Sequence, residues 1–98
     1  MFARVTTVQI HPGMADDVTQ YVNEVVLPAA QKAHGFGGFQ ILLNPATNKG
    51  IAITFWDSQA DMTAGEASGG YYTQALAGAA RFFSAPPDRE SYEVRVKE

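Results

Sequence analysis

The feature that most constrains the fold of this chain is the order in which strand-like and helix-like patterns of apolar residues follow one another. Residues 2–10 are rich in Val, Thr and Ile and run into a His-Pro-Gly turn, which is typical of a strand. Residues 14–34 predict an amphipathic helix, because apolar side chains recur at intervals of three and four: Val18, Tyr21, Val22, Val25, Ala29 and Ala33. Pro28 predicts a kink from Glu24 onward, and Gly35 predicts a left-handed cap.

Two short apolar runs, residues 39–43 and 51–56, flank a connector with the sequence NPATNKG. Asn, Pro and Gly favour turns, so the two runs are expected to pair as an antiparallel hairpin. Ser58 followed by Asp61 resembles a capping box and predicts the start of a second helix.

The second helix is expected to break at the Ser-Gly-Gly segment 68–70, to resume through Phe83 and to end at Pro86-Pro87. Residues 91–97 alternate between apolar and charged, which predicts a half-exposed strand. The resulting β-α-β-β-α-β order predicts one α+β domain of ferredoxin-like topology over residues 1–98, a four-stranded antiparallel sheet with both helices on one face.

The middle strands are expected to be apolar on both faces. Phe39, Ile41 and Leu43 alternate with Leu42, and the next strand carries Ile, Phe and Trp on its two faces. Such strands belong to sheets that are buried on both sides, whereas the helices cover only one side. We therefore expect a homodimer that joins through the sheet faces; a moderately apolar face tolerated by a monomer is the alternative.

Composition narrows the classes of partner and cofactor. The 98 residues are 46% hydrophobic and 17% charged, with a net charge of −3, and the seven basic residues are scattered. These values indicate a globular chain without nucleic-acid affinity. The chain has no cysteine, and His11 and His34 lack metal-ligand spacing, so no metal or other cofactor is expected. No membrane span or signal peptide is visible, which makes a cytoplasmic location the default.

The sequence resembles the antibiotic biosynthesis monooxygenase-like group of the dimeric α/β-barrel superfamily. The resemblance rests on residues 2–5 (FARV), 26–29 (VLPA), 34–36 (HGF) and 54–58 (TFWDS). In quinone-forming members a Trp at the position of Trp56 lines the pocket, and this chain keeps it. The partner Asn and Tyr of those enzymes fall on Ala52 and Met62. Two polar groups of that pocket are thus missing.

The same resemblance disfavours haem degradation. The catalytic Asn, Trp and His of haem-degrading relatives would fall near Thr6, Gly65 and Ala75. None of the three matches. Many members of the group also carry a His at the position of Gly65, which is absent here.

Six residues are candidates for a ligand pocket between sheet and helices: Arg4, Thr6, Trp56, Met62, Tyr72 and Phe83. Trp56 and Tyr72 are the catalytic candidates, because an indole N–H or a phenol can hold a substrate oxygen. Both could equally be packing residues. Arg4 and Thr6 share one face of the first strand, and this face either lines the pocket or meets a partner subunit. Trp56 is expected to be partly exposed to the cavity.

Three functions remain open at this point. The leading hypothesis is a cofactor-independent monooxygenase-like protein acting on a small planar aromatic or polyketide-like substrate. The alternatives are a non-catalytic barrel that binds a small molecule or serves a stress role, and a muconolactone-type isomerase. A pocket that contains Trp56 and at least two convergent polar groups would favour catalysis, and a pocket lined only by apolar atoms would favour binding.

Overall fold

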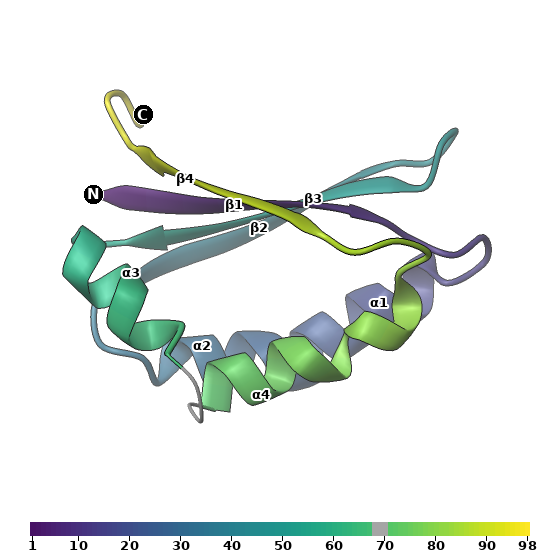
Figure 1. Ribbon diagram of the computed structural model, residues 1–98, viewed down its shortest axis with the longest axis horizontal. Helices are drawn as coiled ribbons and strands as arrows, with labels where there is room; N and C mark the ends of the chain where they lie inside the picture. Colours follow the sequence, from purple (N-terminus) through teal and green to yellow (C-terminus); the bar gives the residue numbers. More distant parts are fainter. Residues whose placement is uncertain (68–70) are drawn as a thin grey trace.

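The structure, a computed structural model, describes residues 1–67 and 71–98, and at Tyr71 and Tyr72 it describes the backbone alone. Four strands form one antiparallel sheet: β1 (Phe2–Gln9), β2 (Phe36–Asn44), β3 (Lys49–Trp56) and β4 (Asp88–Glu93). Their spatial order is β2-β3-β1-β4. The helices lie together on one face of this sheet (Figure 1). The predicted ferredoxin-like arrangement is thereby confirmed.

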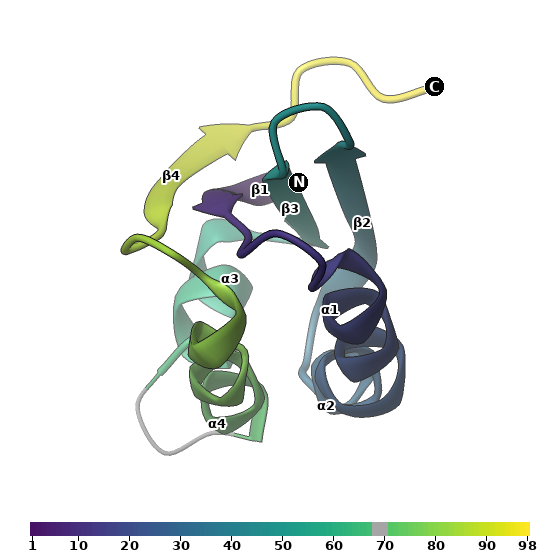
Figure 2. The same ribbon diagram turned by 90° about the vertical axis from the view of Figure 1, so that its right-hand side faces the viewer.

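The helices form two arms under the sheet. The first arm joins α1 (Ala15–Tyr21), a π-helical segment (Val22–Val26) and α2 (Leu27–Gln31), and it lies on the β2 side (Figure 2). The second arm contains α3 (Gln59–Gly65), α4 (Tyr71–Gly78) and a 3₁₀ turn (Ala80–Phe82), and it lies on the β4 side (Figure 2).

The π-helical segment explains how the first arm tolerates Pro28. Proline has no N–H, so the carbonyl of Glu24 cannot receive the usual bond from Pro28. The Leu27 N–H instead donates to the carbonyl of Val22, five residues back. The sequence predicts a kink caused by Pro28, and the structure has a π-helical segment just before this proline.

The π-helical segment also changes which residues of the first helical arm are buried. The wider π turn spaces inward-facing residues four apart, so Val18, Val26 and Ala30 are buried. The predicted stripe included Val25, which is 41% exposed. A strict period of 3.6 residues places Val25 inside, and the extra residue of the π turn moves it out.

The hairpin and the cap of α3 follow their sequence signals. β2 and β3 pair along their whole length, with an irregularity between Phe36 and Gly38. The Asp61 N–H donates to the Ser58 hydroxyl at 3.1 Å, as the capping signal predicts. Gly35 has φ +77°, and a Cβ there would lie 2.2 Å from Asp61 Oδ2. Position 35 therefore needs glycine for two reasons: the positive φ angle, and the lack of space for a Cβ atom.

The last strand corrects the predicted boundaries. β4 runs from Asp88 to Glu93, not from residue 91 to 97, because β1 supplies partners only that far: Phe2 pairs with Glu93. Beyond it, the Val94 N–H donates to the Met1 carbonyl at 2.9 Å, and Val96 is 90% exposed. Alternation of apolar and charged residues predicts a strand, but the strand ends where the neighbouring strand supplies no further hydrogen-bond partners, and alternation does not show that point.

The second helix also ends earlier than predicted. α4 ends at Gly78, and Phe83 is extended backbone that bridges Ile10. α3 ends at Gly65 and α4 begins at Tyr71, while the Ser-Gly-Gly segment 68–70, where the interruption was predicted, lies outside the described residues.

Register assigns a face to each strand residue. Arg4 pairs with Thr54, and Thr54 pairs with Phe39, all on the helix side. The opposite face carries Val5, Ile53 and Phe55, extended by Leu42 and Tyr92, which are 51% and 50% exposed. We call these five residues the outer apolar face. The predicted alternation of apolar side chains over both faces of the middle strands is confirmed.

Candidate functional site

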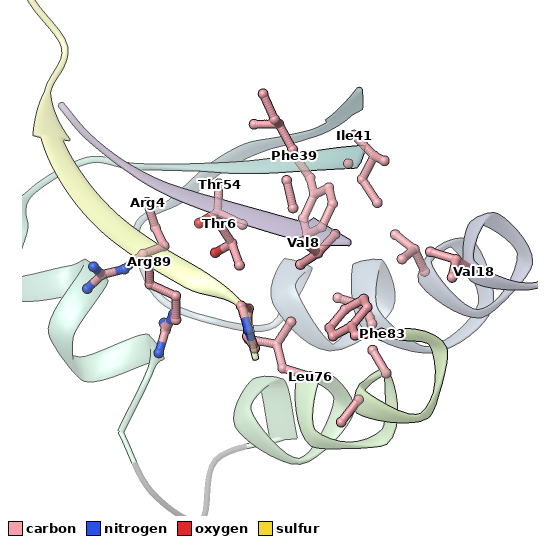
Figure 3. Close-up of a pocket in the computed structure, with 18 of the residues that line it drawn as sticks. Arg4, Thr6, Val8, Val18, Phe39, Ile41, Thr54, Leu76, Phe83 and Arg89 are labelled. Carbon is pink, nitrogen blue, oxygen red and sulfur yellow. The ribbon is translucent and has the colours of Figure 1, made fainter. Parts of the chain in front are cut away.

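A cavity of about 360 Å³ lies between the sheet and the two helical arms (Figure 3). Most of its wall is apolar and comes from all four strands and both arms, including Val8, Val18, Val22, Phe39, Ile41 and Leu76. Small side chains leave the space unfilled, since Gly50, Ala52, Ala79 and Ala80 stand in the wall. A cavity of this size suits a small molecule with a substantial apolar body.

One end of the cavity carries a cluster of three charged side chains, Arg4, Glu66 and Arg89, which we call the arginine cluster. Arg4 donates to Glu66 Oε1 from Nε at 3.1 Å and from Nη2 at 2.9 Å. Arg89 Nη2 lies 3.1 Å from the second oxygen, Oε2. The Glu66 side chain is only 8% exposed, against 21% for Arg4 and 43% for Arg89. A carboxylate this deeply buried is stable because two guanidiniums contact it.

The fold explains why these residues meet. Arg4 and Thr6 alternate on the helix-facing side of β1, and Thr6 pairs directly with Arg89 of β4. Glu66 follows the last turn of α3, so this helix delivers a carboxylate to the same end. Figure 3 shows Arg4 and Arg89 together, with Val18 and Phe83 at the far end. Arg4 and Thr6 thus lie on the face of β1 that lines the cavity.

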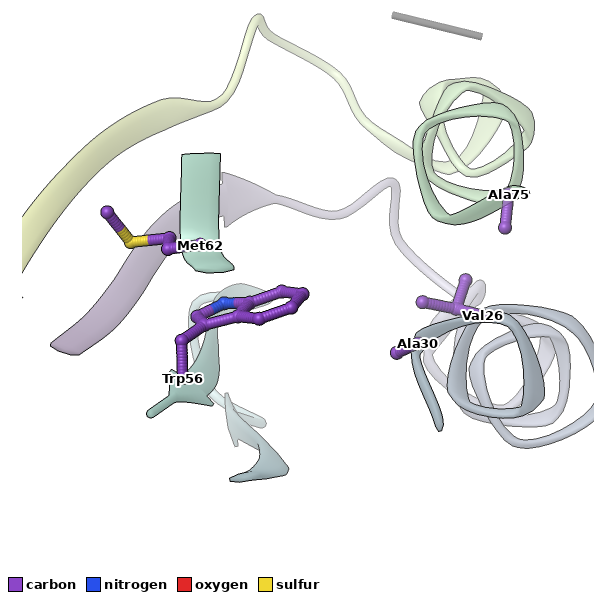
Figure 4. Close-up of a cluster of buried hydrophobic side chains, with 5 residues drawn as sticks. All are labelled: Val26, Ala30, Trp56, Met62 and Ala75. Carbon is purple, nitrogen blue, oxygen red and sulfur yellow. The ribbon is translucent and has the colours of Figure 1, made fainter. Parts of the chain in front are cut away.

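Trp56 does not line the cavity. Its side chain is 0% exposed and belongs to a buried cluster with Val26, Ala30, Met62 and Ala75 (Figure 4). The indole N–H donates to the Thr54 hydroxyl at 3.0 Å, while Phe36 contacts the ring edge-on with centroids 5.7 Å apart. The expectation of a partly exposed Trp56 is corrected. Met62, a candidate for the pocket wall, is 2% exposed and belongs to the same buried cluster.

Gly65 is the reason that so large a side chain fits at this place. A Cβ on Gly65 would lie 2.5 Å from Cη2 of the Trp56 ring. The indole therefore fills the space that any other residue at position 65 would need. Two of the positions compared with haem-degrading relatives, Gly65 and Ala75, thus pack around Trp56, whereas the third, Thr6, lines the cavity.

The six candidates consequently separate into groups. Arg4, Thr6 and Phe83 line the cavity, whereas Trp56 and Met62 form the buried cluster beside it. The side chain of Tyr72 lies outside the described residues.

Sequence reasoning missed four polar or charged residues of the cavity wall: Thr54, Glu66, Thr73 and Arg89. The signal for Thr54 was its position two residues before Trp56 in a strand, which places both on one face. Arg89 lay outside the predicted strand, and Glu66 carried no local signal, because only the packing of α3 against β1 brings it to the cavity.

The described residues contain neither a candidate metal cluster nor a candidate membrane span. Within 1–67 and 71–98, no three His, Asp or Glu side chains lie close enough to hold a metal ion. In the same ranges, no helix is long and apolar enough to cross a membrane.

Known structures share this fold. A monooxygenase from Streptomyces coelicolor, solved with the ligand nanaomycin D, has a TM-score of 0.83 at 12% identity, covering 99% of this chain and 89% of that chain. A candidate antibiotic biosynthesis monooxygenase from Bordetella bronchiseptica has a TM-score of 0.82 at 15% identity, covering 97% of each chain. A Nitrosomonas europaea protein of unknown function has a TM-score of 0.76 at 20% identity, covering 99% of this chain and 91% of that chain. At sequence identities this low, the comparisons show a shared fold and nothing further.

Sequence comparison adds the family. No curated protein matches the chain. The family model described as antibiotic biosynthesis monooxygenase matches residues 1–75, which contain β1 to β3, the first helical arm, α3 and the cavity residues Arg4, Thr6, Thr54 and Glu66. The chain therefore belongs to the antibiotic biosynthesis monooxygenase family.

Proposed function

We propose that the chain is a cofactor-independent monooxygenase that acts on a small planar aromatic or polyketide-like molecule. The observation that carries this proposal is the cavity between sheet and helices, an apolar space of about 360 Å³ with polar groups gathered at one end. Family membership supports the reaction class. The Streptomyces coelicolor structure adds a precedent, because a protein of the same fold holds nanaomycin D.

This reaction needs few catalytic groups from the protein, because the substrate itself reduces O₂. A methylene group activated by a neighbouring carbonyl and aromatic rings loses a proton, and the carbanion gives one electron to O₂. The resulting radical pair combines to a peroxide, which recovers the proton and loses water. The balance is R₂CH₂ + O₂ → R₂C=O + H₂O, and the substrate supplies all the electrons. An apolar cavity contributes by orienting the substrate and removing water from the developing anion.

The cavity's polar groups fit an oxygen-rich edge of such a substrate. Thr6 and Thr54 bring hydroxyls to the wall, and Thr54 is 3% exposed. The Thr54 oxygen accepts from the Trp56 indole, which leaves its own hydroxyl proton able to donate. Trp56 would then act on the ligand through Thr54, as a positioning residue.

The test uses oxygen uptake with an anthrone probe such as 1,8-dihydroxyanthrone, in the presence of a chelator and without added flavin or metal. We expect quinone formation well above the spontaneous rate. Ala52→Leu adds a side chain inside the cavity and should abolish the excess, whereas the same change in the exposed hairpin turn, Ala46→Leu, should not. A rate equal to the spontaneous one would remove the enzymatic proposal.

The competing proposal is non-catalytic binding. It is favoured by the burial of Trp56, whose indole N–H contacts Thr54 and so is not presented to a ligand. Stoichiometric binding of the oxidised quinone without any acceleration of anthrone oxidation would support this alternative.

We further propose that two chains pair through the outer apolar face. Leu42 and Tyr92, half-exposed there, would be covered, and a stable interface needs about 800 Å² per partner. On the same face the hydrogen bond and negative charge of Glu90 raise the pKa of the Tyr92 hydroxyl, which stays protonated. Light scattering at micromolar concentration should give twice the chain mass of 10.6 kDa.

A matched pair of variants tests the interface. Leu42→Lys should shift the mass to that of one chain, because it introduces a charge into the outer apolar face. Val25→Lys, at a similarly exposed position of the first helical arm, should leave the mass unchanged. A single-chain mass for the unmodified protein would exclude the dimer.

A further inference from the structure

We propose that the arginine cluster is an anion site, and that the ligand of this cavity is an apolar ring system carrying one acidic oxygen group, a carboxylate or a phenolate. This inference rests on the proposed function, because it assumes that the cavity holds a small molecule. It adds the ligand's charge and the side chain that recognises it, Arg89.

The charge at the polar end supports an anion. Arg4 and Arg89 contribute two positive charges and Glu66 one negative charge, which leaves one positive charge uncompensated within the cluster. Among the described residues that line the cavity, these three are the charged ones. An anionic group entering this end is attracted, and an ammonium group is repelled. Because the surroundings are mostly apolar, this preference is less screened than on an open surface.

The donors of Arg89 support the same conclusion. A guanidinium has five N–H groups, and Arg4 directs its Nε and one Nη at Glu66. The contact of Arg89 with Glu66 runs from Nη2, at 3.1 Å from Oε2. Within the described part of the chain, its Nε and Nη1 have no protein acceptor. A planar guanidinium with one edge unoccupied is suited to a carboxylate, which can accept two parallel bonds.

The positions of the three side chains give each a role. Glu66 is the most buried and Arg4 lies beside it, so this pair forms a fixed floor. Arg89 is 43% exposed and stands on the edge strand β4, where a ligand can reach it from the solvent. The apolar wall beyond Thr6 would then hold the ring system (Figure 3).

Calorimetric titration with three probes of similar size tests the proposal: 1-naphthoate, neutral 1-naphthamide and cationic 1-naphthylmethylammonium. We expect naphthoate to bind about tenfold more tightly than naphthamide, the effect of one charge-assisted contact, and the cation to bind most weakly. Arg89→Gln should abolish the preference while leaving naphthamide affinity unchanged, and Arg89→Lys should retain part of it.

Two further variants control the interpretation. Arg95→Gln removes an equivalent charge from an arginine that is 84% exposed and paired with Glu93, and it should leave all three affinities unchanged. Glu66→Gln removes the negative charge of the cluster and should strengthen naphthoate binding several-fold, provided that the melting temperature shows a folded protein.

The outcomes separate this inference from the proposed function. Equal binding of naphthoate and naphthamide overturns the anion site and leaves the cavity as an aromatic binding site. A preference for naphthoate that survives Arg89→Gln overturns the assignment to this cluster. Failure of all three probes to bind overturns both the anion site and the proposed small-molecule function.

Discussion

Trp56 and Ala52 stand on the same face of β3, yet the space above them differs completely. Above Trp56, the indole fills the gap between sheet and helices and contacts Gly65 on α3. Above Ala52, the sheet and the first arm are separated by the cavity, whose wall includes Gly50, Ala79 and Ala80. The layer between sheet and helices thus has a filled end and a hollow end, and the size of a few side chains decides which is which.

Thr54 lies between the two ends and connects them. It accepts the indole N–H of Trp56, and it also lines the cavity. The packed side chains of the filled end fix the distance between the sheet and the helices. An empty cavity cannot fix that distance, so the hollow end depends on the filled end for its shape. If this is correct, substitutions at the filled end should change stability, and substitutions at the hollow end should change ligand binding.

Trp56→Ala should have the largest effect. A fully buried Trp contributes a large apolar area, and its loss leaves a cavity beside Val26 and Met62. We expect the free energy of unfolding to fall by about 3–5 kcal/mol, measured by urea denaturation with far-UV circular dichroism. A loss below about 1 kcal/mol would mean that the indole is not a packing residue, and the division into two ends would fail.

How far the sequence predicts these two ends can be argued from a few residues. That Arg4 and Thr6 share one face of β1, and that Ser58 caps α3, follow from period and local chemistry, because each depends on neighbours in the chain. Which side of the sheet that face meets did not follow from the sequence. The burial of Trp56 depends on Gly65 being small and close, and the position of Glu66 depends on how α3 packs on β1. Neither is encoded in a local pattern. The phase change at Val25 was missed because Pro28 signals a disturbed helix but does not show that one residue is inserted into the 3.6-residue period.

Gly65→Ala should have the next largest effect. The added Cβ would lie 2.5 Å from the Trp56 ring, so the indole or α3 must move. Alanine favours a helix by about 1 kcal/mol, but overpacking costs typically 1–3 kcal/mol, so we expect a net loss of about 1 kcal/mol. Trp56 fluorescence during urea denaturation measures it, since this is the one tryptophan of the chain.

A double-mutant cycle separates contact with the indole from a backbone effect. In the Trp56→Phe background the outer part of the indole is absent, so Gly65→Ala should there be neutral or stabilising. Equal costs in both backgrounds would show that Gly65 is needed for a reason other than the indole.

Ser58→Ala should cost about 1 kcal/mol, because it removes the acceptor of the Asp61 N–H at the start of α3. α3 serves both ends: Met62 packs beside Trp56, and Glu66 follows its last turn. The loss, measured by urea denaturation, should therefore be accompanied by weaker naphthoate binding if the anion site exists. Ser58→Asp keeps an acceptor and should retain stability; a loss equal to that of Ser58→Ala would argue against the cap.

Ala52→Val should have the smallest effect on stability, and it is the counterpart of Gly65→Ala at the hollow end. Both substitutions add carbon atoms between the sheet and the helices. Ala52, however, borders the cavity, and its strand neighbours Thr6 and Ile41 already stand beside it. Valine also favours strands. We expect the free energy of unfolding to stay within about 0.5 kcal/mol of the original or to rise, as in other cavity-filling substitutions.

The same Ala52→Val protein should bind naphthamide more weakly, because the added methyl groups occupy space that the ring system needs. Urea denaturation and calorimetry on one preparation give both quantities. A loss of stability comparable to that of Gly65→Ala would mean that the layer is as tightly packed above Ala52 as above Trp56. The cavity would then be too small for an aromatic ligand, and the contrast between the two ends would disappear.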